Sequence, residues 1–167
     1  MMDIKLNEWL IDFKKRLEQL NFMNNSGDFG KKGLWLGGLF YQDAFMTATR
    51  QAVAQEKKWS LEELSLEISV GSELGPEDNG YVIKKLTLES AKWSNDQLEY
   101  SHELSTSLPD TVFRWVRDKP SSDKISIPVY LNNSRKKLLF SVEVAEGEGS
   151  HMLWYQRGAA IAAWSLN

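Results

Sequence analysis

The sequence predicts an α+β fold in which N-terminal helices pack on an antiparallel β-barrel of about six strands. Up to residue 57 the apolar residues recur at steps of three and four, which is the spacing of one helix face. From Trp59 onward they alternate with polar residues, which is typical of half-buried strands. Short strands separated at close intervals by turn residues favour a sheet that curls into a barrel or sandwich.

The chain has 167 residues, of which 42% are hydrophobic and 26% are charged. Size scaling for such a chain indicates that about 70% of the unfolded surface is buried on folding, which is enough for a core without disulfides or metals. We expect a helical segment at 1–58 and a barrel at 59–167, and we expect the two parts to form one unit.

In the helical segment, one helix is expected at about 4–22, a loop at 23–34 and a second helix at about 42–57. The loop is rich in Asn and Gly, which favour turns. On the first helix, Asp12, Lys15 and Glu18 face away from a wide apolar stripe that must be covered, so we expect this helix to pack on a partner surface. The stripe consists of Leu6, Trp9, Leu10, Phe13, Leu17 and Leu20.

An apolar run at 34–40 joins the loop to the second helix and holds the pair Gly37-Gly38. Trp35 and Phe40 flank this pair, and we expect both to be core anchors between the helices and the barrel.

The expected strands follow the alternation of apolar residues and lie at 64–70, 82–88, 97–100, 112–116, 124–131 and 137–144. Pro128 cannot donate a ladder hydrogen bond, so we expect it at a sheet edge or a bulge. The segment 152–164 is ambiguous, and Gly158 could divide it into a short helix and a strand. The bulky residues Phe113, Trp115 and Phe140 favour a filled barrel interior.

Composition argues against catalytic chemistry. The chain has no cysteine and two histidines, which excludes a thiol nucleophile, a Cys-ligated zinc site and an iron–sulfur cluster. His102 and His151 are expected to be surface residues. No Walker or Rossmann pattern occurs around Gly27, Gly30 and Gly33, so we expect neither binding nor hydrolysis of ATP. We expect no catalytic, cofactor-binding or metal-binding residues.

Partners and location follow from charge and hydropathy. The net charge of −3 does not favour a nucleic-acid binder. The N-terminus has no apolar signal segment, and the apolar stretch near residue 160 is too short to cross a bilayer, so we expect a cytosolic protein without membrane contact.

Several ordered segments resemble the C-terminal region of dynein heavy chains, and of the cytoplasmic type in particular. The order and spacing match along nearly the whole chain. The first helix resembles the family through Trp9, Leu10, Phe13, Arg16 and Leu17. The other matching segments are Leu36-Gly37-Gly38-Leu39-Phe40, 45–51 with Arg50, 59–64 with Trp59, 104–109, 114–116, Pro128-Val129-Tyr130-Leu131-Asn132 with Arg135, and Tyr155-Gln156-Arg157-Gly158.

The resemblance implies a function. The chain would be the non-catalytic regulatory end of a microtubule motor, docked on the AAA+ ring of the same heavy chain and modulating force and processivity. It would be cytoplasmic and associated with the cytoskeleton, and would meet the microtubule only through the parent motor. The signature positions, which we expect to be structural or docking residues, are Trp9, Phe13, Leu36, Gly37, Gly38, Leu39, Phe40, Arg50, Trp59, Pro128, Tyr130, Arg157 and Gly158.

Two other outcomes remain open at this stage. The exposed stripe of the first helix would favour self-association of the fragment. A stand-alone barrel that binds a peptide or small ligand is the alternative function, and an empty barrel interior would favour it.

Overall fold

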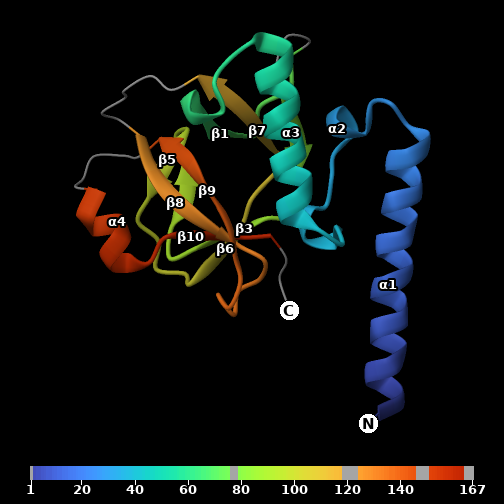
Figure 1. Ribbon diagram of the computed structural model, residues 1–167. Helices are drawn as coiled ribbons and strands as arrows, with labels where there is room; N and C mark the ends of the chain where they lie inside the picture. The colour runs from blue at the N-terminus through green and yellow to red at the C-terminus, as the bar shows by residue number, and fades with distance from the viewer. Residues whose placement is uncertain (1, 76–78, 118–123, 146–150, 164–167) are drawn as a thin grey trace.

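The computed structural model describes residues 2–75, 79–117, 124–145 and 151–163. Its helices are α1 at Met2–Asn25, α2 at Phe29–Lys32, α3 at Gln42–Lys57 and α4 at His151–Arg157, with 3₁₀ turns η1 at Leu36–Gly38 and η2 at Leu61–Glu63. The helix α1 is longer than the expected range of 4–22, and α2 lies where a loop was expected. The helices α1 and α4 lie at opposite ends of the molecule (Figure 1).

The strands are short and mostly follow the expected positions. They are β1 at Leu64–Val70, β2 at Gly80–Ile83, β3 at Thr87–Glu89, β4 at Lys92–Ser94, β5 at Gln97–Glu99, β6 at Ser105–Ser107, β7 at Thr111–Arg117, β8 at Lys124–Tyr130, β9 at Leu138–Ala145 and β10 at Ala160–Ala162.

Eight of these strands form one sheet in the order β2-β7-β1-β9-β8-β10-β3-β6, and β4 and β5 form a separate hairpin. The α+β class is confirmed. The sheet is mixed, because β1 pairs in parallel with β9 and β10 pairs in parallel with β8, so the expectation of a purely antiparallel sheet was wrong. Among the described residues, the end strands β2 and β6 do not pair with each other, so a closed barrel is not confirmed.

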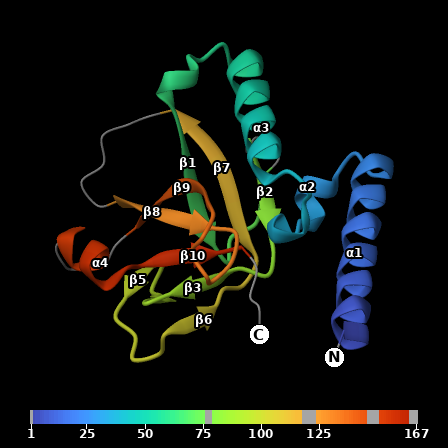
Figure 2. The ribbon, with the colours of Figure 1, turned by 60° about the horizontal axis from the view of Figure 1, so that its bottom comes forward.

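The sheet is strongly curled. Figure 2 shows β1 and β7 nearly upright while β8, β10 and β3 run across them. Successive side chains of a strand point to opposite faces of the sheet, and in β1 and β8 every second residue is buried. One face of the sheet therefore forms the core. The inner side chains join one apolar cluster with Leu34, Leu36, Leu39 and Met46 of the helical segment. Phe113, at 1% exposure, contacts Phe140 edge-on with ring centroids 6.1 Å apart, so large side chains occupy the described interior.

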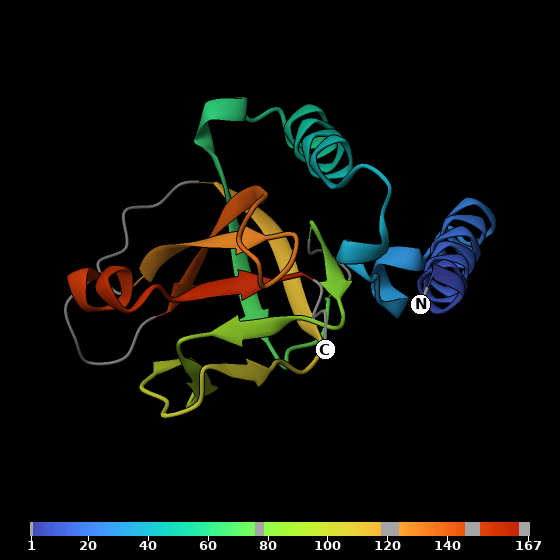
Figure 3. The same cartoon turned by 90° about the horizontal axis from the view of Figure 1, so that it is seen from below.

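The helix α3 lies beside β1 and β7 (Figures 1 and 3). It is joined to the sheet by a second small cluster of Val53, Ala54 and Leu64. The half-buried Trp115 packs against that cluster and donates a hydrogen bond from its indole nitrogen to Oγ1 of Thr49 at 3.0 Å. Trp115 therefore fills the region under α3.

Two local features differ from the expected strands. The segment expected as one strand at 82–88 is divided into β2 and β3, because Lys85 between them has a φ of +60° that interrupts extended backbone. Of the two expected positions for Pro128, the sheet edge does not hold, because β8 is flanked by β9 and β10, whereas an irregularity of the ladder lies beside it. Pairing with β10 begins only at Val129, and a register shift follows between Val129 and Tyr130. The missing N–H is thus accommodated next to an irregularity of the ladder.

The ambiguous segment at the C-terminal side is resolved into α4 and β10. Gly158 lies between them with a φ of +71°, a conformation that favours glycine. No helix in the described part of the chain is long and apolar enough to cross a membrane.

Ser90 gives a prediction about stability, because its φ of +62° lies in the left-handed region. A non-glycine residue in this conformation destabilises the folded state by about 1–2 kcal/mol. Glycine avoids this cost, but its greater conformational freedom in the unfolded chain offsets part of the gain. We expect Ser90→Gly to stabilise the domain by about 0.5–1 kcal/mol in urea unfolding. Ser94→Gly in the extended strand β4 is the matched control and should destabilise it. A Ser90→Gly domain less stable than the parent would contradict the prediction.

Candidate docking surface

The apolar stripe of α1 faces solvent, although the sequence predicts that a partner surface covers it. We call this stripe the docking face. Helical spacing places its members on one side of α1, and each keeps a large exposed fraction: Leu6 56%, Trp9 57%, Leu10 47%, Phe13 36%, Leu17 43% and Leu20 41%. Contiguous apolar surface of this kind marks interaction sites in soluble proteins.

The docking face continues onto the rest of the domain through aromatic rings. Trp9 stacks on Phe13 with ring centroids 5.2 Å apart, and Phe13 meets Phe40 edge-on at 6.1 Å. Phe40 is 41% exposed, and its neighbour Tyr41 is 79% exposed. The expectation that Phe40 is a core anchor was therefore wrong: Phe40 extends the apolar surface that begins on α1.

The side of α1 that meets the domain is polar along most of its length, and near the end of the helix Met23 packs against the main apolar cluster. Asp12 was expected to face away from the packed side, yet it is half-buried and accepts a hydrogen bond from Nε of Arg16 at 2.7 Å. Arg16 in turn reaches the carbonyl of Leu39 at 3.3 Å. The usual orientation of an amphipathic helix, apolar side inward, is thus not adopted here.

The Gly-Gly signature has a steric reason. Leu36, Gly37, Gly38 and Leu39 are all buried. A side chain on Gly38 would come within 2.2 Å of the indole ring of Trp35, so only glycine allows this ring to lie flat on the backbone. Trp35 itself is half-buried, which is less than the expectation of a core anchor implies.

Arg50 and Trp59 fasten α3 to the sheet. The guanidinium of Arg50 hydrogen-bonds to the carbonyl of Leu61 and lies 6.0 Å from the ring of Trp115. Trp59 is half-buried against Val53 and Ala54. These contacts of Arg50 and Trp59 lie within the domain.

The remaining signature residues lie at the other end of the domain, near α4. Arg135 donates a hydrogen bond to the carbonyl of Gly158 at 2.7 Å, and its guanidinium lies 5.7 Å from the ring of Tyr130. Arg157 lies over the ring of Tyr100 at 4.3 Å. Arg135 therefore supports the turn between α4 and β10, and Pro128 lies in β8.

The structure therefore distributes the signature residues over four places and does not bring them into one site. Trp9, Phe13 and Phe40 are the signature members of the exposed apolar surface. The resemblance did not include Leu6, Leu20 and Tyr41, although periodicity had already placed Leu6 and Leu20 on the stripe with Leu10 and Leu17.

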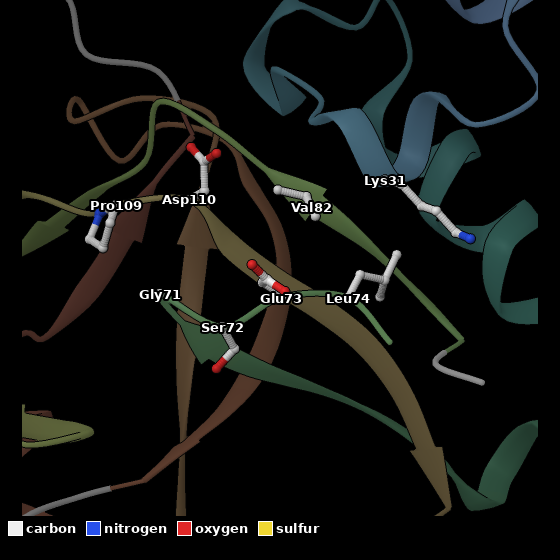
Figure 4. Close-up of a pocket in the computed structure, with 8 residues that line it drawn as sticks. All are labelled: Lys31, Gly71, Ser72, Glu73, Leu74, Val82, Pro109 and Asp110. Atoms are coloured by element: carbon white, nitrogen blue, oxygen red, sulfur yellow. The ribbon is translucent and has the colours of Figure 1, made fainter. Parts of the chain in front are cut away.

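The described clefts are open and shallow, which weakens the alternative of a ligand-binding module. The one drawn in Figure 4 has a volume of about 560 Å³ and is lined by residues that include Lys31, Glu73 and Asp110. The ammonium end of Lys31 points away from both carboxylates (Figure 4). Ligand sites combine an enclosed apolar cleft with converging polar groups, and this cleft has no such convergence.

A neighbouring cleft of about 400 Å³ lies between α2, α3 and β2 and reaches the ring of Tyr81. Burial raises the pKa of the Tyr81 hydroxyl, and its ring stacks on Phe29 at 6.0 Å and meets Phe45 edge-on at 5.3 Å. Tyr81 is thus a packing residue. Within the described ranges, no group of three His, Asp or Glu side chains is arranged to hold a metal ion. His102 is exposed and bonded to the hydroxyl of Tyr100 at 3.1 Å, and His151 has no described side chain.

Comparison with known proteins identifies the family. The family model of the C-terminal domain of dynein heavy chains matches residues 2–163. Similar proteins named "Dynein heavy chain, cytoplasmic" include those of Dictyostelium discoideum at 40% identity over 96% of this chain, Paramecium tetraurelia at 35% over 96% and Drosophila melanogaster at 36% over 92%. The chain spans about 4% of the length of each of these relatives. It belongs to the family of C-terminal domains of dynein heavy chains.

Proposed function

We propose that this chain is the regulatory C-terminal domain of a cytoplasmic microtubule motor, and that its docking face binds the AAA+ ring of the same heavy chain. The observation that carries the proposal is the exposed apolar stripe of α1, in a chain that matches heavy chains about 25 times longer. The occupant is therefore part of the heavy chain outside this segment. The proposed location is the cytoplasm, on the cytoskeleton.

The energetics of burial support a docked helix. Fully burying a leucine or phenylalanine side chain is worth about 1.5–3 kcal/mol, and the residues of the docking face are about half exposed, so each has part of that free energy still to gain. The aromatic continuation through Phe13 and Phe40 would place part of the domain body in the same interface.

We propose that 1–58 and 59–167 dock as one unit. Two connections support this. Leu34 forms a parallel bridge with Ile83 of β2, with backbone hydrogen bonds of 2.8 Å on both sides. The indole of Trp115 is bonded to Thr49 of α3.

In this proposal the chain supplies no catalytic group, and ATP hydrolysis belongs to the parent motor. A domain of this kind regulates only if it binds the states of the ring with different affinities, because equal binding shifts no equilibrium. A coupling free energy of about 1–3 kcal/mol would change the occupancy of a motor state by about 5- to 150-fold.

Removal of residues 1–167 from the parent motor tests the proposal. We expect ATP hydrolysis to continue, since no catalytic group is lost, and we expect run length or stall force to change because the bias between ring states is gone. The measurement is single-molecule motility under load, together with bulk ATPase activity. Unchanged force and run length would refute a regulatory role. Loss of ATPase activity in a folded ring would instead identify a structural brace.

A further inference from the structure

The side chain of Gln19 connects α1 to the rest of the domain through two hydrogen bonds to backbone groups. The amide nitrogen Nε2 of Gln19 donates to the carbonyl of Trp35 at 2.9 Å, and the backbone N–H of Trp35 donates to Oε1 of Gln19 at 2.8 Å. Gln19 thus pairs with both backbone groups of a single residue. Both residues are only half-buried, so water can replace either hydrogen bond.

A second residue of α1 reinforces this contact. The guanidinium of Arg16 lies 5.3 Å from the centre of the Trp35 ring and reaches the carbonyl of Leu39 at 3.3 Å, while Asp12 holds it in place. The ammonium group of Lys85, from the β2–β3 connection, lies 5.1 Å from the same ring. Trp35 is therefore contacted by cations from α1 and from the sheet.

The connection from α1 to the domain is confined to a short turn. The helix ends at Asn25, and α2 begins at Phe29. A methyl group at Gly27 would meet nothing within 4 Å, and Gly27 and Asp28 are exposed, while Ser26 is half-buried. The next segment is fixed, because a methyl group on Gly30 would lie 2.6 Å from the Tyr81 ring, on which Phe29 stacks. Any rotation of α1 against the domain is thus concentrated at 26–28.

We propose that the Gln19–Trp35 pair is a releasable latch that sets the angle between α1 and the sheet, with 26–28 as the pivot. The hydrogen bonds that hold α1 to Trp35 are polar and exchangeable with water, whereas its apolar stripe, apart from the contact of Phe13 with Phe40, is exposed to an occupant. Two hydrogen bonds of ordinary net strength favour the closed arrangement over the open one by about 5- to 150-fold. Together with the Arg16–Leu39, Phe13–Phe40 and Met23 contacts, these bonds keep the open arrangement a minor one in the parent chain.

The latch makes α1 an element with two arrangements. A partner that binds the docking face more tightly at one angle of α1 than at the other shifts the population toward the angle it prefers. The free energy of the latch opposes a shift toward the open arrangement. This property belongs to the chain by itself and does not depend on which partner the docking face binds. Its test can therefore fail while the proposed function stands, and the reverse also holds.

Distance measurement between spin labels tests the latch in the 167-residue chain. The sequence has no cysteine, so Glu8→Cys on α1 and Gln51→Cys on α3, both at exposed positions, would be the only labelled sites. We expect one narrow distance distribution in the parent pair. We expect Gln19→Ala to add a second population or broaden the distribution, because the ratio of closed to open chains falls about 5- to 150-fold.

Glu18→Ala is the matched control, since it truncates the neighbouring exposed side chain and should leave the distribution unchanged. Gln19→Glu is a second variant that keeps the size of the side chain and the acceptor for the Trp35 N–H but has no donor for the Trp35 carbonyl at neutral pH. It should open the latch, and it decides the matter if Gln19→Ala disturbs folding. Distributions in both Gln19 variants that equal that of Glu18→Ala would overturn the proposal.

Discussion

Phe113→Ala is expected to destabilise the domain by about 3–5 kcal/mol, while Phe40→Ala is expected to cost less than about 1 kcal/mol. Phe113 is 1% exposed, lies opposite Ile68 of β1 and packs against the Phe140 ring, so truncation leaves a cavity in the centre of the curled sheet. Phe40 is 41% exposed, and water replaces much of what its removal leaves behind.

Urea unfolding followed by circular dichroism measures both values, and equal m-values would show that the two variants unfold from comparable states. The pair is matched because the same ring is removed from two environments of one domain. A cost above about 3 kcal/mol for Phe40→Ala would contradict the exposed position and restore the expectation of a core anchor.

Leu10→Asp combined with Leu17→Asp is expected to abolish docking in the parent motor while leaving the domain folded. The two positions are seven residues apart and share one side of α1, so both carboxylates would lie in the proposed interface. The transfer free energy of two leucines is lost and two charges must be desolvated, which together weaken docking by more than about 100-fold. Run length and stall force should then change as they do on removal of the whole segment.

Ile11→Asp is the control for this experiment. Ile11 is 57% exposed, but successive helical residues are rotated by about 100°, which places Ile11 off the stripe. The control should therefore keep the motility of the parent. If Ile11→Asp and the double variant behave alike, the effect comes from charge or helix stability, and the docking face as defined here is wrong.

The sequence predicted those helices and strands whose conformation depends mainly on residues nearby in the chain. The alternation of Leu64, Leu66, Ile68 and Val70 matches β1, and Gly158 separates α4 from β10 as its conformational freedom suggests. The pattern failed at Lys85, where a positive φ divides an alternating segment, and at the edge strand β6, whose sequence Ser-Thr-Ser has no apolar face to reveal it.

The orientation of α1 could not be predicted from its stripe. Periodicity shows which residues share a side, but it assumes that the apolar side meets the rest of the molecule. Here the hydrogen bonds to the domain come from Arg16 and Gln19, and their partner atoms are backbone groups of Trp35 and Leu39 that carry no sequence signal. The family resemblance identified Phe13 and Phe40, but only the structure shows their rings in contact.

The place of β10 in the sheet has a consequence for biosynthesis. The strand pairs with β8 on one side and β3 on the other, so within the described part of the chain it alone links β3 and β6 to the rest of the ladder. A ribosome makes β3 and β6 long before β10, and until β10 emerges these two strands have no hydrogen-bonded route to β8. The sheet is therefore completed only by pairing strands that are far apart in the sequence, which slows folding. Until β10 has been synthesised, the apolar side chains of Leu86 and Leu88, which are buried in the folded domain, are exposed in the nascent polypeptide and need protection from aggregation.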